Sequence, residues 1–110
     1  MLKMDMEYSR GILFVRLNGK LNRKTTYKIN NYLLTILLKH KIKYLVYNLY
    51  NLEDIDEDGI DALLNTKSAI KQNNGLIYVC EVNKLLNKTI NKLKIKKIDN
   101  ELIAYKVIEV

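Results

Sequence analysis

The sequence predicts an α/β protein in which helices pack on a mixed, mainly parallel sheet of about four or five strands, in the order ββαβαβαβα. Short apolar runs alternate with longer stretches of helical periodicity, which is typical of parallel strands joined by helical crossovers. The first two runs lie only a few residues apart, which indicates an antiparallel hairpin at the sheet edge. No Pro- or Gly-rich linker interrupts the 110 residues, so we expect one domain over residues 1–110.

The predicted strands follow from apolar runs rich in β-formers. Residues 4–8 and 12–17 should form the hairpin, and Asn18-Gly19 is expected to end its second strand. Residues 44–49 and 76–80 are nearly continuous in apolar character, as expected of strands covered on both faces. A short strand is expected at residues 96–98.

Helical periodicity is clearest from about residue 23 to residue 40, where apolar side chains recur at i, i+3, i+4, i+7 and i+8. The positions expected to face the sheet are Ile29, Tyr32, Leu33, Ile36 and Leu37. A second helix is expected over residues 60–72, a third over residues 86–93, and a last helical turn from residue 101.

Composition excludes several classes of protein. Hydrophobic residues make up 48% and charged residues 28%, so we expect a globular chain. No apolar run reaches the ~20 residues of a membrane-spanning helix, and the first residues lack the features of a secretory signal. Cys80 is the only cysteine, which excludes an intramolecular disulfide and suits a reducing compartment. We therefore expect a cytoplasmic protein without membrane insertion.

The net charge of +7 allows two interpretations. A basic chain can bind nucleic acid or an anionic membrane surface. The excess of Lys over Arg and the absence of Pro also fit compositional drift in an AT-rich genome, which we favour. Lys84, Lys88 and Lys92 recur every four residues, as on a solvated helix face, and aromatic residues for base stacking are scarce beside them. No nucleic-acid partner is expected.

Residues for catalysis do not gather in any recognised pattern. His40 is the only histidine and is expected to serve the end of the first helix, while Cys80 is expected to be a small core residue. A metal site or a Ser-His relay would need partners that are not apparent, and no Gly-rich phosphate loop occurs. We expect no enzyme activity, no metal and no cofactor.

An acidic run from Glu53 to Asp58 separates the strand at 44–49 from the helix expected near residue 60. Carboxylates in a first helical turn each contribute about 0.3–1 kcal/mol, so helix capping is one explanation. Calcium is a second, because Asp54, Asp56 and Asp58 match the first half of an EF-hand loop; the required Glu at the twelfth position is, however, Asn65. A third is a binding surface, since sites in α/β sheets gather at this carboxyl edge.

Four segments, residues 12–22, 44–52, 56–64 and 74–80, match the landmarks of one family in order and with natural spacing. Gly19-Lys20-Leu21-Asn22 stands where that family has a G-x-L-D turn, and Asp56-Glu57-Asp58-Gly59 stands where it has D-S-S-G. The chain therefore resembles the STAS domain of the anti-sigma factor antagonists, and the resemblance implies a STAS-like fold.

The resemblance also implies a role in bacterial partner switching. In the family, a serine kinase that is also the anti-sigma factor phosphorylates the first Ser of D-S-S-G. The unphosphorylated antagonist binds this kinase and frees the sigma factor, and the phosphate abolishes that binding. Here Glu57 and Asp58 replace the two serines, and Asn22 replaces the acid of G-x-L-D. Glu57 carries a charge of about −1, whereas phosphoserine carries about −1.5 to −2, so Glu57 imitates the modified state only in part.

We expect an anti-sigma factor antagonist-like binding module that lacks the usual phosphorylatable Ser, with an anti-sigma factor or serine kinase-like protein as partner. Its expected binding surface consists of Asp56, Glu57, Asp58, Gly59 and Asn22. One alternative is a STAS scaffold subunit of a lipid-transport or stress-signalling assembly, and another is a basic binder of nucleic acid or membrane surfaces. The sequence leaves the oligomeric state undetermined.

Overall fold

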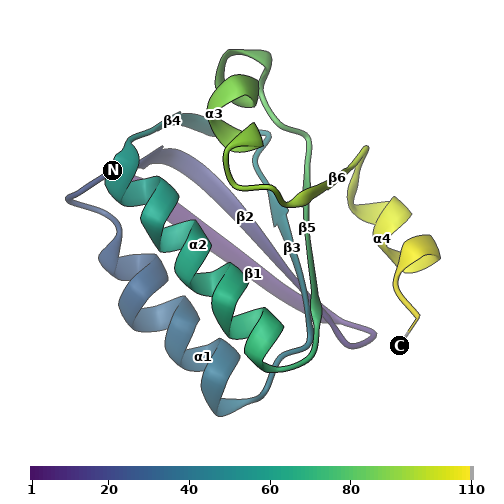
Figure 1. The fold of residues 1–110 in the computed structure, drawn as a ribbon. Helices are drawn as coiled ribbons and strands as arrows, with labels where there is room; N and C mark the ends of the chain where they lie inside the picture. Colours follow the sequence, from purple (N-terminus) through teal and green to yellow (C-terminus); the bar gives the residue numbers. More distant parts are fainter. Residues whose placement is uncertain (110) are drawn as a thin grey trace.

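The computed structural model describes residues 1–109, which form a six-stranded sheet with helices on both faces (Figure 1). The strands are β1 (Leu2–Ser9), β2 (Ile12–Leu21), β3 (Tyr44–Asn48), β4 (Leu52–Ile55), β5 (Leu76–Cys80) and β6 (Lys96–Ile98). The helical segments are η1 (Lys28–Leu33), α1 (Leu34–Lys39), α2 (Glu57–Gln72), η2 (Lys84–Leu86), α3 (Asn87–Asn91) and α4 (Glu101–Val107).

The sheet has the order β1-β2-β3-β5-β6, and β4 pairs with the far end of β2. Only β1 runs antiparallel to its neighbour; the pairs from β2 to β6 are parallel. Arg10 and Gly11 close the β1–β2 hairpin with positive φ angles of 53° and 82°, as tight two-residue turns require. The predicted α/β class, with a mainly parallel sheet and an antiparallel edge, is confirmed.

β2 is longer than the sequence pattern indicated. Gly19 has a φ of 111°, and the register with β4 shifts between Gly19 and Lys20. A glycine bulge of this kind bends a strand without ending it. The expectation that Asn18-Gly19 ends the strand was therefore wrong, and the extra length of β2 gives β4 a partner where the sequence indicated only a turn.

The first long helix starts with a π-helical turn, η1, and continues as α1. A π-helix bonds each residue to the fifth one along, so its side chains drift away from the α-helical positions. Ile29, Leu33 and Leu37 are fully buried, as expected. Tyr32 was expected to face the sheet, but it is 62% exposed and its ring lies 6.5 Å from that of Tyr27.

Two apolar clusters hold the layers together. The larger cluster lies between the sheet and the helices η1, α1 and α2, of which α1 and α2 run side by side in Figure 1. The smaller cluster lies beneath α4 on the other face. β2 serves both, since Leu13, Val15 and Leu17 join the larger cluster, while Ile12 and Phe14 join the smaller one. None of the helices in residues 1–109 has the length and apolar character of a membrane span.

Candidate functional site

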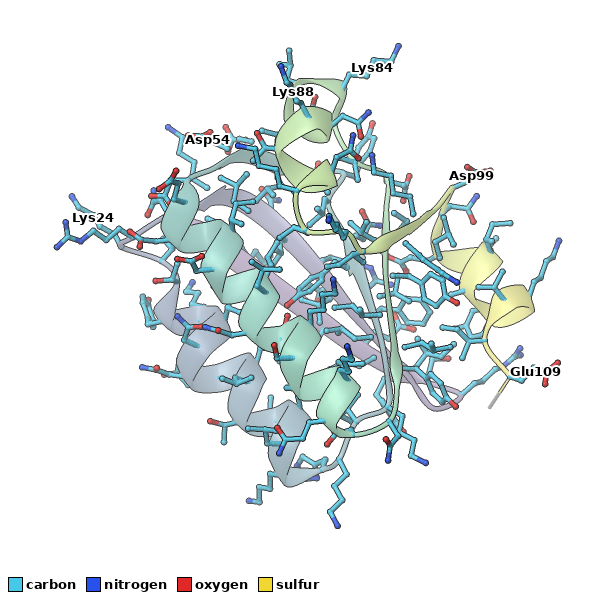
Figure 2. All side chains as sticks on the ribbon, in the orientation of Figure 1. Lys24, Asp54, Lys84, Lys88, Asp99 and Glu109 are labelled. Carbon is cyan, nitrogen blue, oxygen red and sulfur yellow. The ribbon has the colours of Figure 1, made fainter. Side chains whose placement is uncertain are left out.

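The acidic residues singled out in the sequence lie at the start of α2, which begins at Glu57, three residues earlier than the pattern indicated. Asp56, Glu57 and Asp58 are exposed, whereas Gly59 is buried. Asp54 projects from the neighbouring β4 at the same end of the molecule (Figure 2). This end therefore presents several carboxylates to solvent.

Among these acidic residues, Asp56 stabilises the local fold through hydrogen bonds to the backbone. Its Oδ1 accepts a hydrogen bond of 2.8 Å from the backbone N–H of Gly59, which caps the helix. Its Oδ2 accepts one of 3.0 Å from the backbone N–H of Arg23, and its own N–H donates to the carbonyl of Leu21 at 3.2 Å. Asp56 thus joins the start of α2 to the turn that follows β2.

Asn22 lies in that same turn, so the structure brings the two motifs of the resemblance next to each other. The Oδ1 of Asn22 accepts a hydrogen bond of 3.0 Å from the N–H of Lys24, and its backbone N–H donates to Oγ1 of Thr25 at 2.9 Å. Thr25 in turn donates to the carbonyl of Lys20 at 2.8 Å. Asn22 therefore shapes the turn, and its link to the acidic residues runs through the Arg23–Asp56 bond.

Gly59 allows α2 to approach β2 closely. A Cβ atom at this position would lie 2.5 Å from the carbonyl oxygen of Leu21 and 2.7 Å from Cγ1 of Ile55. Any side chain would push the helix start away from the strand end. Gly59 therefore lets the start of α2 pack against the end of β2, while Glu57 and Asp58 are exposed to solvent.

An open groove of about 510 Å³ runs between the start of α2 and α3. Ile55 and Ile60 supply its apolar part and Lys92 borders it from the α3 side, and the groove is completed by Asp56, Glu57, Asp61 and Thr89. The sequence indicated only a solvated face for Lys92 and nothing for Thr89, because the approach of α3 to α2 is a long-range contact. Such a groove can receive a cationic side chain with an apolar stem.

The calcium interpretation is not compatible with the observed backbone. α2 starts at Glu57, so the later positions of the supposed EF-hand loop are helical and do not wrap around an ion. The carboxylate of Asp56 is already bonded to two backbone N–H groups.

A second polar cluster, which the sequence analysis did not assign, surrounds Arg16 on β2. Its guanidinium donates to both carboxylate oxygens of Glu101 at 2.7 and 2.8 Å and also bonds Asp5 and Glu7 on β1. The hydrogen bond to Glu101 is the main cause that raises the pKa of Arg16, and the same bond lowers the pKa of Glu101. The only feature of the sequence that could have indicated this cluster is Arg16 itself, the single charged residue within the otherwise apolar run of residues 12–17. The cluster fastens α4 to the sheet.

The other residues that could suggest chemistry are placed as expected. Burial, followed by the charges of Glu81 and Glu101, raises the pKa of Cys80 to about 12, so its thiol stays protonated and weakly reactive. His40 is exposed at the end of α1. Lys84 and Lys88 extend into solvent near α3 (Figure 2).

Comparison with known proteins gives one family and one fold. The family model of the STAS domain matches residues 3–107. The chain is 30% identical over 113 residues to the anti-sigma F factor antagonist of Paenibacillus polymyxa, an alignment that covers 99% of this chain and 97% of the relative.

Solved structures with the same fold include the anti-sigma factor antagonist SpoIIAA in its unphosphorylated form, with a TM-score of 0.78, 15% identity and coverage of 98% of this chain and 100% of that one. A serine-to-glutamate variant of RsbS from Moorella thermoacetica gives a TM-score of 0.78 at 13% identity, with coverage of 94% and 92%. The phosphorylated Bacillus SpoIIAA gives 0.77 at 16% identity, with coverage of 99% and 100%.

Proposed function

The chain belongs to the STAS domain family, among the anti-sigma factor antagonists, and from this membership we propose that it acts as a protein-binding module in bacterial partner switching. The observation that carries the proposal is the match over nearly the full length of both chains to an anti-sigma F factor antagonist. In this role the chain works by binding a partner and has no catalytic chemistry of its own. A cytoplasmic location suits its single buried cysteine.

The partner we propose is an anti-sigma factor or a serine kinase-like protein that docks on the start of α2. Glu57 and Asp58 are exposed there, and the adjacent groove combines carboxylates with the apolar side chains of Ile55 and Ile60. A partner that presents basic side chains with apolar neighbours would match this surface in both charge and shape. Asp56, Gly59 and Asn22 support the surface through the backbone contacts described above.

Glu57 replaces the phosphorylatable Ser of the family, and we propose that it holds the surface in one charge state. A carboxylate in the first turn of α2 is stabilised by the free backbone N–H groups at the helix start. Because a serine kinase cannot phosphorylate Glu, this position no longer switches between a neutral hydroxyl and a phosphate. Control of the interaction then comes from the amount of the protein or from another residue.

The test is a calorimetric titration of the purified chain against the anti-sigma factor kinase encoded in the same genome, with Glu57→Ser and Glu57→Gln as variants. Native protein is expected to bind. Glu57→Ser should raise the dissociation constant by about tenfold or more, because it removes a carboxylate that would face the basic side chains of the proposed partner. Labelled ATP should phosphorylate Glu57→Ser and not the native chain.

Glu53→Gln is the matched control, because it removes an exposed carboxylate from β4 outside the helix start and should leave binding unchanged. If neither the native chain nor any variant binds the kinase, the antagonist role is wrong. If all of them bind equally and Glu57→Ser stays unphosphorylated, the antagonist role stands and the fixed-state role of Glu57 is wrong.

A further inference from the structure

A second surface lies at the opposite end of the sheet from the acidic residues, where the β1–β2 turn, the α1–β3 loop and the end of α2 meet at the lower edge of Figure 1. A groove of about 380 Å³ opens there and is lined by Tyr8, Leu13, Ile36, His40 and Ile42. Leu13 and Ile42 are buried at its base, whereas Tyr8 is 62% exposed at its edge. The lining is mostly apolar.

The residues around this groove are basic. Lys39 ends α1, Lys41 and Lys43 follow it in the α1–β3 loop, and all three are exposed. Arg10 in the hairpin turn is directed away from the groove, because its guanidinium lies 5.2 Å from the ring centroid of Tyr105 on the α4 side of the sheet. Every ion pair within residues 1–109 is made by Arg16, so none of these three lysines is neutralised by an acid of the described chain. One lysine beside a helix end is expected from the helix dipole, but Lys41 and Lys43 lie beyond that end.

The acidic residues nearest in sequence to the residues that line the groove have side chains that point away from it. Glu7 on β1 bonds Arg16, whose guanidinium also bonds Glu101 of α4, so the Glu7 carboxylate belongs to the opposite face of the sheet. The acidic run around the start of α2 lies at the far end of the strands. The molecule therefore has one end rich in carboxylates and another that combines cations with an apolar groove.

We propose that this groove, named here the basic groove, binds an acidic amphipathic segment of a partner protein. One or two apolar side chains of that segment enter the groove, and flanking Asp or Glu side chains meet the lysines of the α1–β3 loop. Leu13 and Ile42 lie at the base of a recess, which a protruding side chain reaches and a flat membrane does not. Its volume is near the lower end of ligand pockets, about 300–1,000 Å³, and suits a few side chains.

The groove is independent of the surface proposed for the anti-sigma factor partner. Nucleic acid would require a series of stacking platforms beside the cations. Two rings, those of Tyr8 and His40, line the groove, and the other lining side chains are the aliphatic Leu13, Ile36 and Ile42. The chain could therefore hold one protein at the acidic end and a second at the basic end.

The test is a nuclear magnetic resonance titration of the labelled, full-length chain at physiological ionic strength. The probe is a short synthetic amphipathic helix with Leu and Phe at i, i+3, i+4 and i+7 on one face and Glu on the other. A second peptide of equal charge carries Ser in place of Leu and Phe, and phosphatidylglycerol vesicles serve as a third probe. Amide signals of Leu13, Ile36 and Ile42 should shift with the first peptide at millimolar concentration and stay in place with the other two probes.

Two triple variants, each of which removes three positive charges, distinguish attraction of the peptide by the lysines beside the groove from attraction by the net charge of the protein. One variant is Lys39→Gln, Lys41→Gln and Lys43→Gln; the other is Lys84→Gln, Lys88→Gln and Lys92→Gln. The first should weaken peptide binding by about tenfold, because three ion pairs are lost. The second should change it by less than about twofold, since screening over about 8 Å removes distant charges.

Several results would overturn the proposal. These are the absence of any shift with the apolar acidic peptide, equal binding of the serine-substituted peptide, equal weakening by both triple variants, and shifts of the groove amides by vesicles alone. Binding of the first peptide should persist in Glu57→Ser, so loss of the antagonist function and loss of the basic groove are distinguishable.

Discussion

Arg16 shows how one residue can determine the placement of a whole helix. Its side chain is 34% exposed, yet it bonds carboxylates from two elements, Asp5 and Glu7 on β1 and Glu101 on α4. Asn48 donates a further hydrogen bond of 2.8 Å to Glu101. Paired geometry of this kind between a guanidinium and a carboxylate is stronger than an ordinary surface ion pair.

Glu101→Gln should lower the free energy of unfolding by about 1–2 kcal/mol at neutral pH, because a charged, two-point hydrogen bond is lost. The pKa of Glu101 is lowered in the folded state, so its contribution is complete above the unfolded pKa of about 4.3 and fades as pH falls through the folded value. Urea unfolding of both proteins at neutral and at strongly acidic pH measures this. Equal differences at the two pH values would contradict the assignment.

Gly59→Ala tests the close approach of α2 to β2. Alanine favours a helix by about 1 kcal/mol over glycine, but its Cβ would press on the carbonyl of Leu21. Overpacking against backbone costs about 1–3 kcal/mol, so we expect a net loss of about 1 kcal/mol in the free energy of unfolding. Ser68→Ala, at an exposed site of α2, is the control and should stabilise slightly. A stabilising Gly59→Ala would show that the helix start can move without penalty.

Single residues differ in how far the sequence reveals their roles. Helix capping was one of the explanations offered for the acidic run, and the residue that caps α2 is Asp56, whose partner Gly59 is three residues away. The partners of Arg16 could not be foreseen, because Glu101 is 85 residues distant in the chain. Local hydrogen bonds have sequence signatures, and long-range ion pairs do not.

Among the elements, α2 joins the expected site to the rest of the fold. Asp56→Ala removes its N-cap together with the bond to Arg23, and should lower the free energy of unfolding by about 1–2 kcal/mol. Asp56→Asn keeps an equally good cap and loses only one exposed acceptor, so about 0.5 kcal/mol is expected. Thermal and urea unfolding monitored by circular dichroism measure both changes. Equal losses for the two variants would mean that the charge matters more than the cap.

Most strands and helices could be predicted from periodicity, and the exceptions have a common physical cause. β3 and β5 appear as apolar runs because both of their faces are covered. β4 was missed because its strand conformation comes from pairing with the end of β2, which no local pattern records. The exposed position of Tyr32 was missed because the pattern assumed α-helical spacing, and η1 is a π-helix.

On the scale of the whole molecule, the two clusters of the core are unequal. The larger one lies beneath η1, α1 and α2, whereas the smaller one is covered by the short α4. Regions with few buried apolar contacts open at lower free energy than the whole protein unfolds. α4 should therefore exchange its amide hydrogens through a local opening that leaves the sheet intact.

Ile29→Val separates this local opening from global unfolding. Ile29 is fully buried in the larger cluster, so losing one methylene should lower the free energy of unfolding by about 0.5–1.5 kcal/mol. If α4 opens alone, the packing of Ile29 is kept in the open state and exchange from α4 is unchanged. Leu45 and Val46 are fully buried in β3 at the middle of the sheet, so their amides should exchange by global unfolding and lose protection by the full amount. Native-state hydrogen exchange followed by nuclear magnetic resonance measures both groups, and equal loss of protection in α4 and β3 would show that the two clusters unfold as one unit.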